Sequence, residues 1–122
     1  NTQTSTFNSI QVKNVYNYSD ARAKTNIQPL ANCMSRLKKL RTYSYKFKDE
    51  GTAAKAYTLQ KGGNGNEYGL LAQEVEKVFP NLVVTDNEGK KLINYTELIP
   101  VLINAVQQLS SEVEELKGKI SK

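Results

Sequence analysis

The fold is decided by the stretch TELIPVLINAVQQLSSEVEELKGKI, residues 96–120. Its apolar residues recur at alternating intervals of 4 and 3 residues: Leu102, Val106, Leu109, Val113, Leu116 and Ile120. This heptad spacing is typical of an α-helix that packs its apolar seam against the seams of other chains. Positions a of the heptad hold Val106, Val113 and Ile120, and positions d hold Leu102, Leu109 and Leu116. The sequence therefore predicts a long C-terminal helix, over about residues 96–120, that forms a coiled coil.

The residues around this seam define its limits. Glu112 falls at position g and Lys117 at the following e, so the two could pair between chains. Pro100 lies near the start of the helix, so the coil should begin after it. A helix packed on the core of its own domain is the alternative for residues 102–109, whereas beyond Ser110 only the seam is apolar.

The residues between 29 and 95 predict a small core of short helices and strands. One amphipathic helix is predicted over about 29–40, and a second over about 71–79, where Pro80 stops it. Alternating aromatic and polar residues predict a strand over 42–48, and a short strand is predicted over 68–71. Residues 82–84 and 91–93 flank the turn sequence DNEG, residues 86–89, and predict a β-hairpin. The fold class is therefore α+β.

Two further segments have a distinct character. Ile10 and Val12 alternate with polar residues near the N-terminus, as in a half-buried strand. Residues 49–67 contain four glycines with little periodicity, which indicates a flexible hairpin tip or arm. A phosphate-binding loop is not indicated there, because no Lys-Ser or Lys-Thr follows and no buried parallel strand precedes it.

Composition excludes several kinds of site. The chain has 122 residues and no histidine, so a zinc site or a histidine-based triad is excluded, and we expect no metal and no cofactor. The single cysteine, Cys33, cannot form an intrachain disulfide and is interpreted as a small buried side chain. No apolar run approaches the roughly 18 residues of a transmembrane helix, and no signal-peptide pattern opens the chain. We expect a soluble fragment of a longer protein, without a membrane partner.

The net charge of +5 gives only weak support for an anionic partner. The basic residues are scattered, and the densest cluster, Lys38, Lys39 and Arg41, has no nucleic-acid motif with interleaved aromatics around it. We interpret that cluster as a solvated helix face, so nucleic acid is an unfavoured partner.

The stretch SDARAK, residues 19–24, combines a possible nucleophile with a possible base. Alone it is a weak signal, because Ser and Asp often open helices and Lys often covers solvated faces. Two more motifs follow in order: GLLAQEVEKVFPNLV at residues 69–83, and INY at 93–95 leading into the C-terminal helix. Together the three resemble the C-terminal intramolecular chaperone domain of phage tailspikes and tail fibres, of the endosialidase type. The resemblance covers roughly residues 19–109.

The resemblance implies a function and its residues. Members of this family form homotrimers and then cut themselves off as single-turnover serine endopeptidases with a Ser-Lys dyad. By resemblance, Ser19 is the nucleophile, Lys24 is the general base, and the bond cut lies between Tyr18 and Ser19. Arg22 would help Lys24 to lose its proton, and Asp20 would orient the site or, more in keeping with its position, cap a helix. Residues 1–18 would be the end of the stalk or fibre, and residues 19–122 the chaperone domain.

The resemblance also implies a setting. The partners would be two further copies of the chain and its own N-terminal stalk region, and the chain would be the precursor of a virion tail protein in the host cytoplasm during phage assembly. Valine or isoleucine at a with leucine at d favours two strands in parallel model coils, yet fewer than three heptads exert a weak preference, so we expect three. Two other interpretations stay open: a non-cleaving trimerisation module in which Ser19 only caps a helix, and a basic DNA-associated domain.

Overall fold

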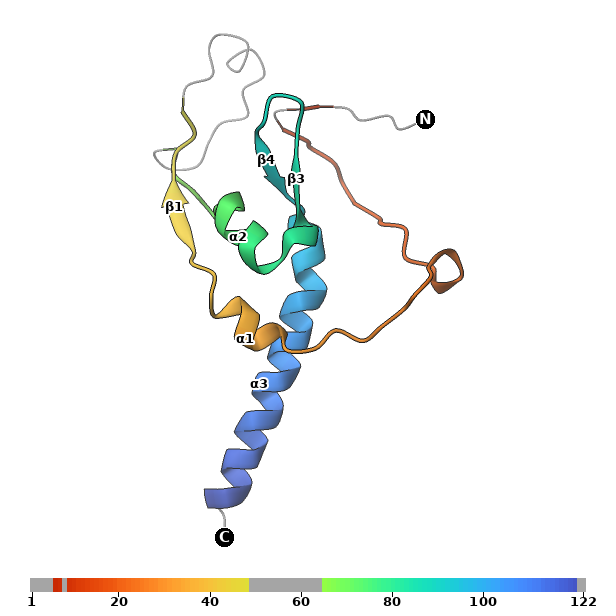
Figure 1. The fold of residues 1–122 in the computed structure, drawn as a ribbon, viewed down its shortest axis with the longest axis vertical. Helices are drawn as coiled ribbons and strands as arrows, with labels where there is room; N and C mark the ends of the chain where they lie inside the picture. Colours follow the sequence, from red (N-terminus) through yellow and green to blue (C-terminus); the bar gives the residue numbers. More distant parts are fainter. Residues whose placement is uncertain (1–5, 8, 49–64, 121–122) are drawn as a thin grey trace. The chain divides into compact units, whose positions relative to one another are not determined.

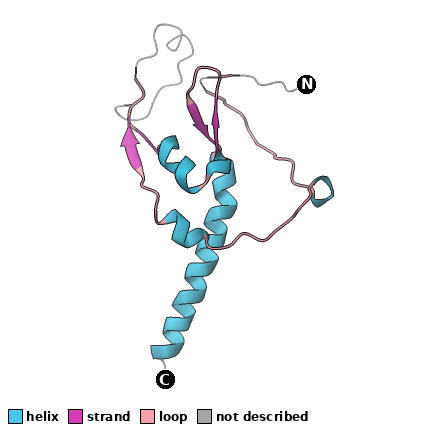
Figure 2. Ribbon diagram, in the orientation of Figure 1, coloured by secondary structure: helices cyan, strands magenta, loops and turns pink. Residues whose placement is uncertain are grey.

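The computed structural model describes residues 6, 7, 9–48 and 65–120. The chain divides into two compact units. The first unit is Asn1–Ile27 with Tyr45–Glu67, and the second unit is Gln28–Ser44 with Tyr68–Lys122. Short helices, short strands and one long C-terminal helix make up the described chain, which confirms the predicted α+β class (Figures 1 and 2).

Along the chain, the described helices and strands follow in the order α1, β1, β2, α2, β3, β4 and α3. The helices are α1 (Cys33–Leu37), α2 (Ala72–Val78) and α3 (Leu98–Ile120), and the strands are β1 (Tyr43–Tyr45), β2 (Glu67–Gly69), β3 (Val83–Thr85) and β4 (Lys91–Ile93). Single 3-10 turns cover Ala21–Ala23, Pro80–Leu82 and Tyr95–Glu97. Strands β1 and β2 form one two-stranded sheet, and β3 and β4 form another.

Helix α3 confirms the prediction for residues 96–120. The side chain of Asn94 accepts the backbone N–H of Glu97 and so caps the 3-10 turn that leads into the helix. Pro100 is the third residue of α3, where the missing N–H would have no partner within the helix in any case. The helix therefore tolerates this proline and reaches a length of 23 residues.

Helix α1 is much shorter than the helix predicted over residues 29–40, which was wrong at both ends. Asn32 has a φ of 60°, in the left-handed region, so the helix cannot begin before Cys33. At the other end, Lys39 and Leu40 donate to the carbonyls three residues earlier, so the last turn tightens and stops.

The hairpin and α2 form where they were predicted. Val83, Val84 and Thr85 pair antiparallel with Ile93, Leu92 and Lys91. Asp86 Oδ1 accepts the backbone N–H groups of Glu88 and Lys90, both at 2.9 Å, and Gly89 supplies the positive φ that the turn requires.

The predicted strands over 42–48 and 68–71 are both shorter in the structure. Strand β2 ends at Gly69 because the N–H of Leu70 donates to the hydroxyl of Tyr95 at 3.0 Å, away from any strand ladder. Leu71 then becomes the N-cap residue of α2. The polypeptide thus turns from strand to helix within two residues.

The core of the second unit is apolar and draws on several elements. Its buried residues are Cys33, Val75, Phe79, Leu82, Val83, Leu98, Val101 and Ala105. Cys33 is fully buried, as predicted from its apolar surroundings. Only the first part of α3 contributes buried residues, and from residue 109 to residue 120 every side chain of the helix is exposed.

The predicted N-terminal strand is absent from the described residues 9–18, which contain no regular secondary structure. Ile10 and Val12 are exposed there. A strand needs a neighbour to take its backbone hydrogen bonds, and alternation in sequence cannot supply one. Most of the arm predicted over 49–67 lies outside the described residues, which resume at Gly65.

Candidate functional site

Ser19 and Lys24 meet across a short turn in the first unit. The Lys24 Nζ donates to the Ser19 Oγ at 2.7 Å. Between them, the N–H of Ala23 donates to the carbonyl of Asp20 at 3.0 Å, and the N–H of Lys24 donates to the carbonyl of Ala21 at 3.1 Å. These two bonds form the 3-10 turn and bring Lys24 back toward Ser19. The structure therefore places the predicted nucleophile and base in contact.

Asp20 caps this turn and holds Arg22. Asp20 Oδ1 accepts the backbone N–H of Arg22 at 2.9 Å, while Oδ2 accepts the Arg22 Nη2 at 2.8 Å. The cap is thus Asp20 and not Ser19, because Asp20 directly precedes the turn Ala21–Ala23 and its carboxylate accepts the N–H two residues on. The side-chain hydrogen bond from Arg22, followed by the backbone one, lowers the pKa of Asp20, and Asp20 in turn raises the pKa of Arg22.

Ser19 and Lys24 are both exposed, and so is Tyr18, whose carbonyl belongs to the predicted scissile bond. A serine hydroxyl becomes a nucleophile when a base takes its proton. A lysine can act as that base only in its neutral form, which burial away from water favours. The contact supplies the proximity that such a pair needs, and the open surroundings leave room for a partner to cover it.

The predicted seam is exposed along the whole of α3. All six of its residues have more than two-fifths of their surface open to solvent, from Val113 at 41% to Ile120 at 81%. Ile99 and Ile103 are exposed beside them. Ile99 was missed in the heptad assignment although it falls one heptad before Val106, and Ile103 follows a d position. Within residues 102–109, the alternative of packing on the chain's own core holds for Ala105, which is buried beside the seam at position g, and in part for the half-buried Asn104 and Gln108.

Two amides of α3 that lie away from the seam bind the start of α1. Asn104 Oδ1 accepts the N–H of Cys33 at 3.2 Å, and its Nδ2 donates to the carbonyl of Leu30 at 3.3 Å. Gln108 Oε1 accepts the N–H of Met34 at 3.1 Å. We call Asn104 and Gln108 the amide clamp. No local sequence pattern could have revealed it, because its partners lie 71 and 74 residues away.

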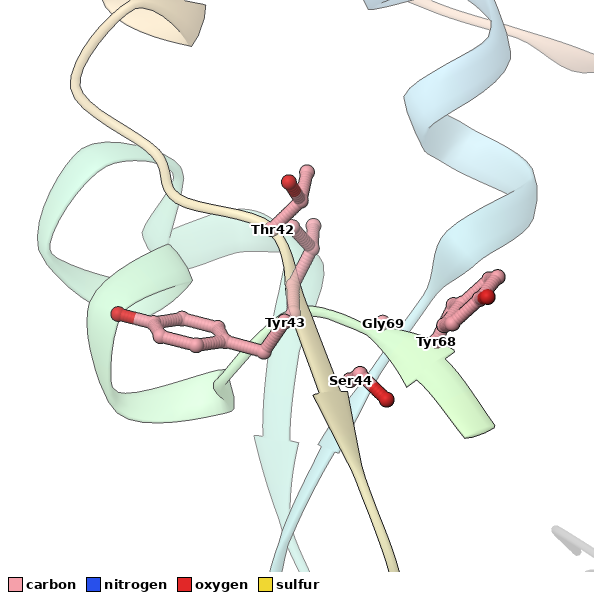
Figure 3. A pocket seen from close by; sticks show the side chains of 6 residues that line it. Thr42, Tyr43, Ser44, Tyr68 and Gly69 are labelled. Carbon is pink, nitrogen blue, oxygen red and sulfur yellow. The ribbon is translucent and has the colours of Figure 1, made fainter. Parts of the chain in front are cut away.

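A pocket of about 540 Å³ lies on β1 and β2, lined by Thr42, Tyr43, Ser44, Tyr68, Gly69 and Leu70. Figure 3 shows the ring of Tyr43 directed toward α2 and the ring of Tyr68 directed the other way. The Tyr43 hydroxyl donates to Glu74 Oε2 at 2.7 Å, and this hydrogen bond raises the pKa of Tyr43. The pocket holds no nucleophile paired with a base, so we assign it no chemistry.

Two other kinds of site are absent from the described ranges. Within residues 6, 7, 9–48 and 65–120, no three His, Cys, Asp or Glu side chains gather as a metal site would need. Over the same ranges, no helix is both long and apolar enough to cross a membrane.

Comparison with known proteins gives one family and a consistent set of relatives. Residues 19–84 match the family described as "Chaperone of endosialidase". The long tail fiber protein Gp37 of Enterobacteria phage K3 is 31% identical over 93% of this chain, which spans 9% of that protein. The Gp37 proteins of Enterobacteria phage M1 and Salmonella phage S16 are 32% and 30% identical over 84% of this chain, which spans 40% and 13% of them. The chain thus spans less than half the length of these relatives.

Proposed function

This chain belongs to the family of endosialidase chaperones, and on that premise we propose that it trimerises a phage tail fibre and then releases itself by cutting the bond between Tyr18 and Ser19. The observation that carries the proposal is the 2.7 Å contact between Lys24 Nζ and Ser19 Oγ. The match to the family begins at residue 19, the residue that would become the new N-terminus.

The relatives support the fibre setting. Three phage long tail fiber proteins carry a stretch similar to most of this chain. We propose accordingly that residues 1–18 are the end of a fibre region and that the domain after them guides its assembly. The place of action would be the host cytoplasm, during assembly of the virion tail.

The proposed reaction uses one chain and one water molecule. Neutral Lys24 takes the proton from Ser19 Oγ, and the oxygen attacks the carbonyl carbon of Tyr18. The bond from that carbon to the Ser19 nitrogen breaks, and the nitrogen leaves with the proton that Lys24 returns. Tyr18 is now joined to Ser19 by an ester. Water hydrolyses this ester to give a carboxylate on Tyr18, while Ser19 keeps its hydroxyl and a free α-amine.

Trimerisation would switch this reaction on. Lys24 is exposed in the single chain, and burial in a trimer would favour the neutral amine that acts as a base. The exposed seam of α3 supplies the surface on which three chains would meet. Release after correct assembly would make folding of the fibre hard to reverse, which is a form of kinetic stability.

Mass spectrometry of a chain that carries fibre residues before Asn1 tests the proposal. The wild type should yield a fragment that begins at Ser19, whereas Ser19→Ala should stay intact and still trimerise. Lys24→Arg keeps the charge but cannot give up a proton at neutral pH, so it should stay intact as well. Lys13→Arg, an exposed lysine in the same unit, is the matched control and should cut like the wild type.

A non-cleaving trimerisation module is the second candidate. The observation that favours it is the open position of Ser19 and Lys24, beside a turn that Asp20 caps without their help. A wild-type chain that is trimeric and remains uncut from about pH 6 to about pH 9 would establish this alternative in place of the peptidase.

A further inference from the structure

Helix α1 depends on the amide clamp for its beginning. The first N–H groups of any helix have no partner inside it, and a residue just before the helix usually caps them. Asn32 stands in that place but makes no capping hydrogen bond with its side chain. Asn104 and Gln108 take over this role for Cys33 and Met34. A helix of five residues is too short to persist alone, so α1 exists only while it is docked on α3.

The clamp and the seam occupy opposite sides of α3. In the heptad assignment Asn104 falls at f and Gln108 at c, while the exposed seam holds a and d. The same helix can therefore hold α1 on one side and two further copies of the chain on the other. The clamp and the seam share the same turns of α3, since the seam residue Val106 lies between Asn104 and Gln108 in sequence.

The clamp also binds the backbone a few residues after Lys24. Asn104 Nδ2 donates to the carbonyl of Leu30, and only residues 25–29 separate Leu30 from Lys24. We propose that Asn104 and Gln108 are positioning residues of the self-cleavage, which act by fixing Leu30, Cys33 and Met34, the residues that follow Lys24 closely in the chain. This inference rests on the proposed function, because it assigns the clamp a part in that reaction.

Variants that replace the clamp amides with apolar side chains of similar volume distinguish a role in positioning from a role in folding. Asn104→Leu with Gln108→Met removes the hydrogen bonds but keeps side-chain bulk and helix propensity. The double variant should remain trimeric by light scattering, and its first-order cleavage rate constant should fall by at least about tenfold, as for a misplaced reactive group. Gln107→Met, on an exposed neighbour, is the matched control and should cut at the wild-type rate.

Three further readouts distinguish a positioning role from a merely structural one. Gln108→Glu keeps an acceptor oxygen beside the N-terminus of α1, so it should cut close to the wild-type rate while Gln108→Met does not. The double variant should be slower at every pH without a change in the pH of half-maximal rate. Hydrogen exchange should show the amides of Cys33 and Met34 protected in the wild type and unprotected in the double variant.

Each opposite result overturns the inference. A trimeric double variant that cuts at the wild-type rate, or a shifted pH of half-maximal rate, removes the positioning role. A double variant that no longer trimerises while Gln107→Met does would make the clamp part of assembly instead. If the wild type forms trimers and stays uncut, the proposed function itself fails, and the exchange of Cys33 and Met34 then reports only on the folding of α1.

Discussion

Asp20 shows how a single side chain can shape the turn that brings Ser19 and Lys24 together. Its Oδ1 accepts the backbone N–H and the Nε of Arg22, and its Oδ2 accepts the Nη2, so the turn between Ser19 and Lys24 is closed at its start. The Arg22 guanidinium is thereby paired with the Asp20 carboxylate, with Nη2 and Oδ2 2.8 Å apart. We infer that the pair acts on the shape of the turn, and that the proton chemistry belongs to Lys24.

The pH dependence of this turn follows from the sign of the Asp20 shift. Its pKa lies below the ordinary 3.8 when folded, so the carboxylate stabilises the turn above that value and the contribution is lost as pH falls through the folded pKa. Carbon NMR of the Asp20 carboxyl should show a midpoint below 3.8. Arg22→Ala should bring it back toward 3.8, and Arg41→Ala should leave it in place. An equal midpoint in wild type and Arg22→Ala would contradict the assignment.

The elements differ in how far the sequence could predict them. Helix α3 was predicted within two residues of its start because its apolar period runs for most of its length. The predicted helix was longer than α1 because Leu30 and Leu40 also fit a helical period. The left-handed conformation of Asn32, between Leu30 and α1, is not indicated by any pattern in the sequence. Its caps come from distant residues, which no local pattern can indicate.

In the candidate site, too, contacts between near neighbours in sequence could be predicted and contacts between distant residues could not. Ser19 and Lys24 are five residues apart, so a single turn can join them, and the family motif pointed to both. The capping by Asp20 was also foreseen, from its preference for helix N-termini. The amide clamp was not, since it exists only after α1 has packed against α3.

Phe79 is the residue on which the packing of α2 should depend most. Its side chain is 2% exposed, and the Arg36 guanidinium lies 4.3 Å from the centre of its ring. Phe79→Ala should lower the free energy of unfolding by about 3–5 kcal/mol, through lost burial and the cavity left behind. Urea unfolding followed by circular dichroism, at one fixed protein concentration, measures this.

Tyr68→Ala is the control for that measurement. Tyr68 is 88% exposed, so its replacement should change stability by less than about 0.5 kcal/mol. A loss at Phe79 no larger than the loss at Tyr68 would mean that α2 is not held by this core.

At the scale of the whole molecule, the exposed seam predicts the state of assembly. Leu109 and Leu116 are 53% and 58% exposed in the single chain, and a trimer would bury them. Light scattering should report a trimer at micromolar concentration. Leu109→Asp with Leu116→Asp should give monomers, because buried unpaired charges cost several kcal/mol each.

Ser111→Asp introduces one aspartate on the same helix but away from the seam, and it should leave the trimer intact. Cleavage should stop in the double aspartate variant if assembly switches it on. Once trimers have formed, the rate constant should not change on dilution, since Ser19 and its target bond belong to one chain. A monomeric wild type would overturn this account of the seam.

The long separation between α1 and its clamp also sets an order in time. A ribosome releases the chain from its N-terminus, so Cys33 emerges 71 residues before Asn104. At about 5–20 residues per second, this gap lasts roughly 4–14 s. During that interval the nascent chain carries Ser19 and Lys24 but lacks the partner that completes α1. The spacing of these residues along the chain alone thus gives every copy a delay before α1 can pack against α3.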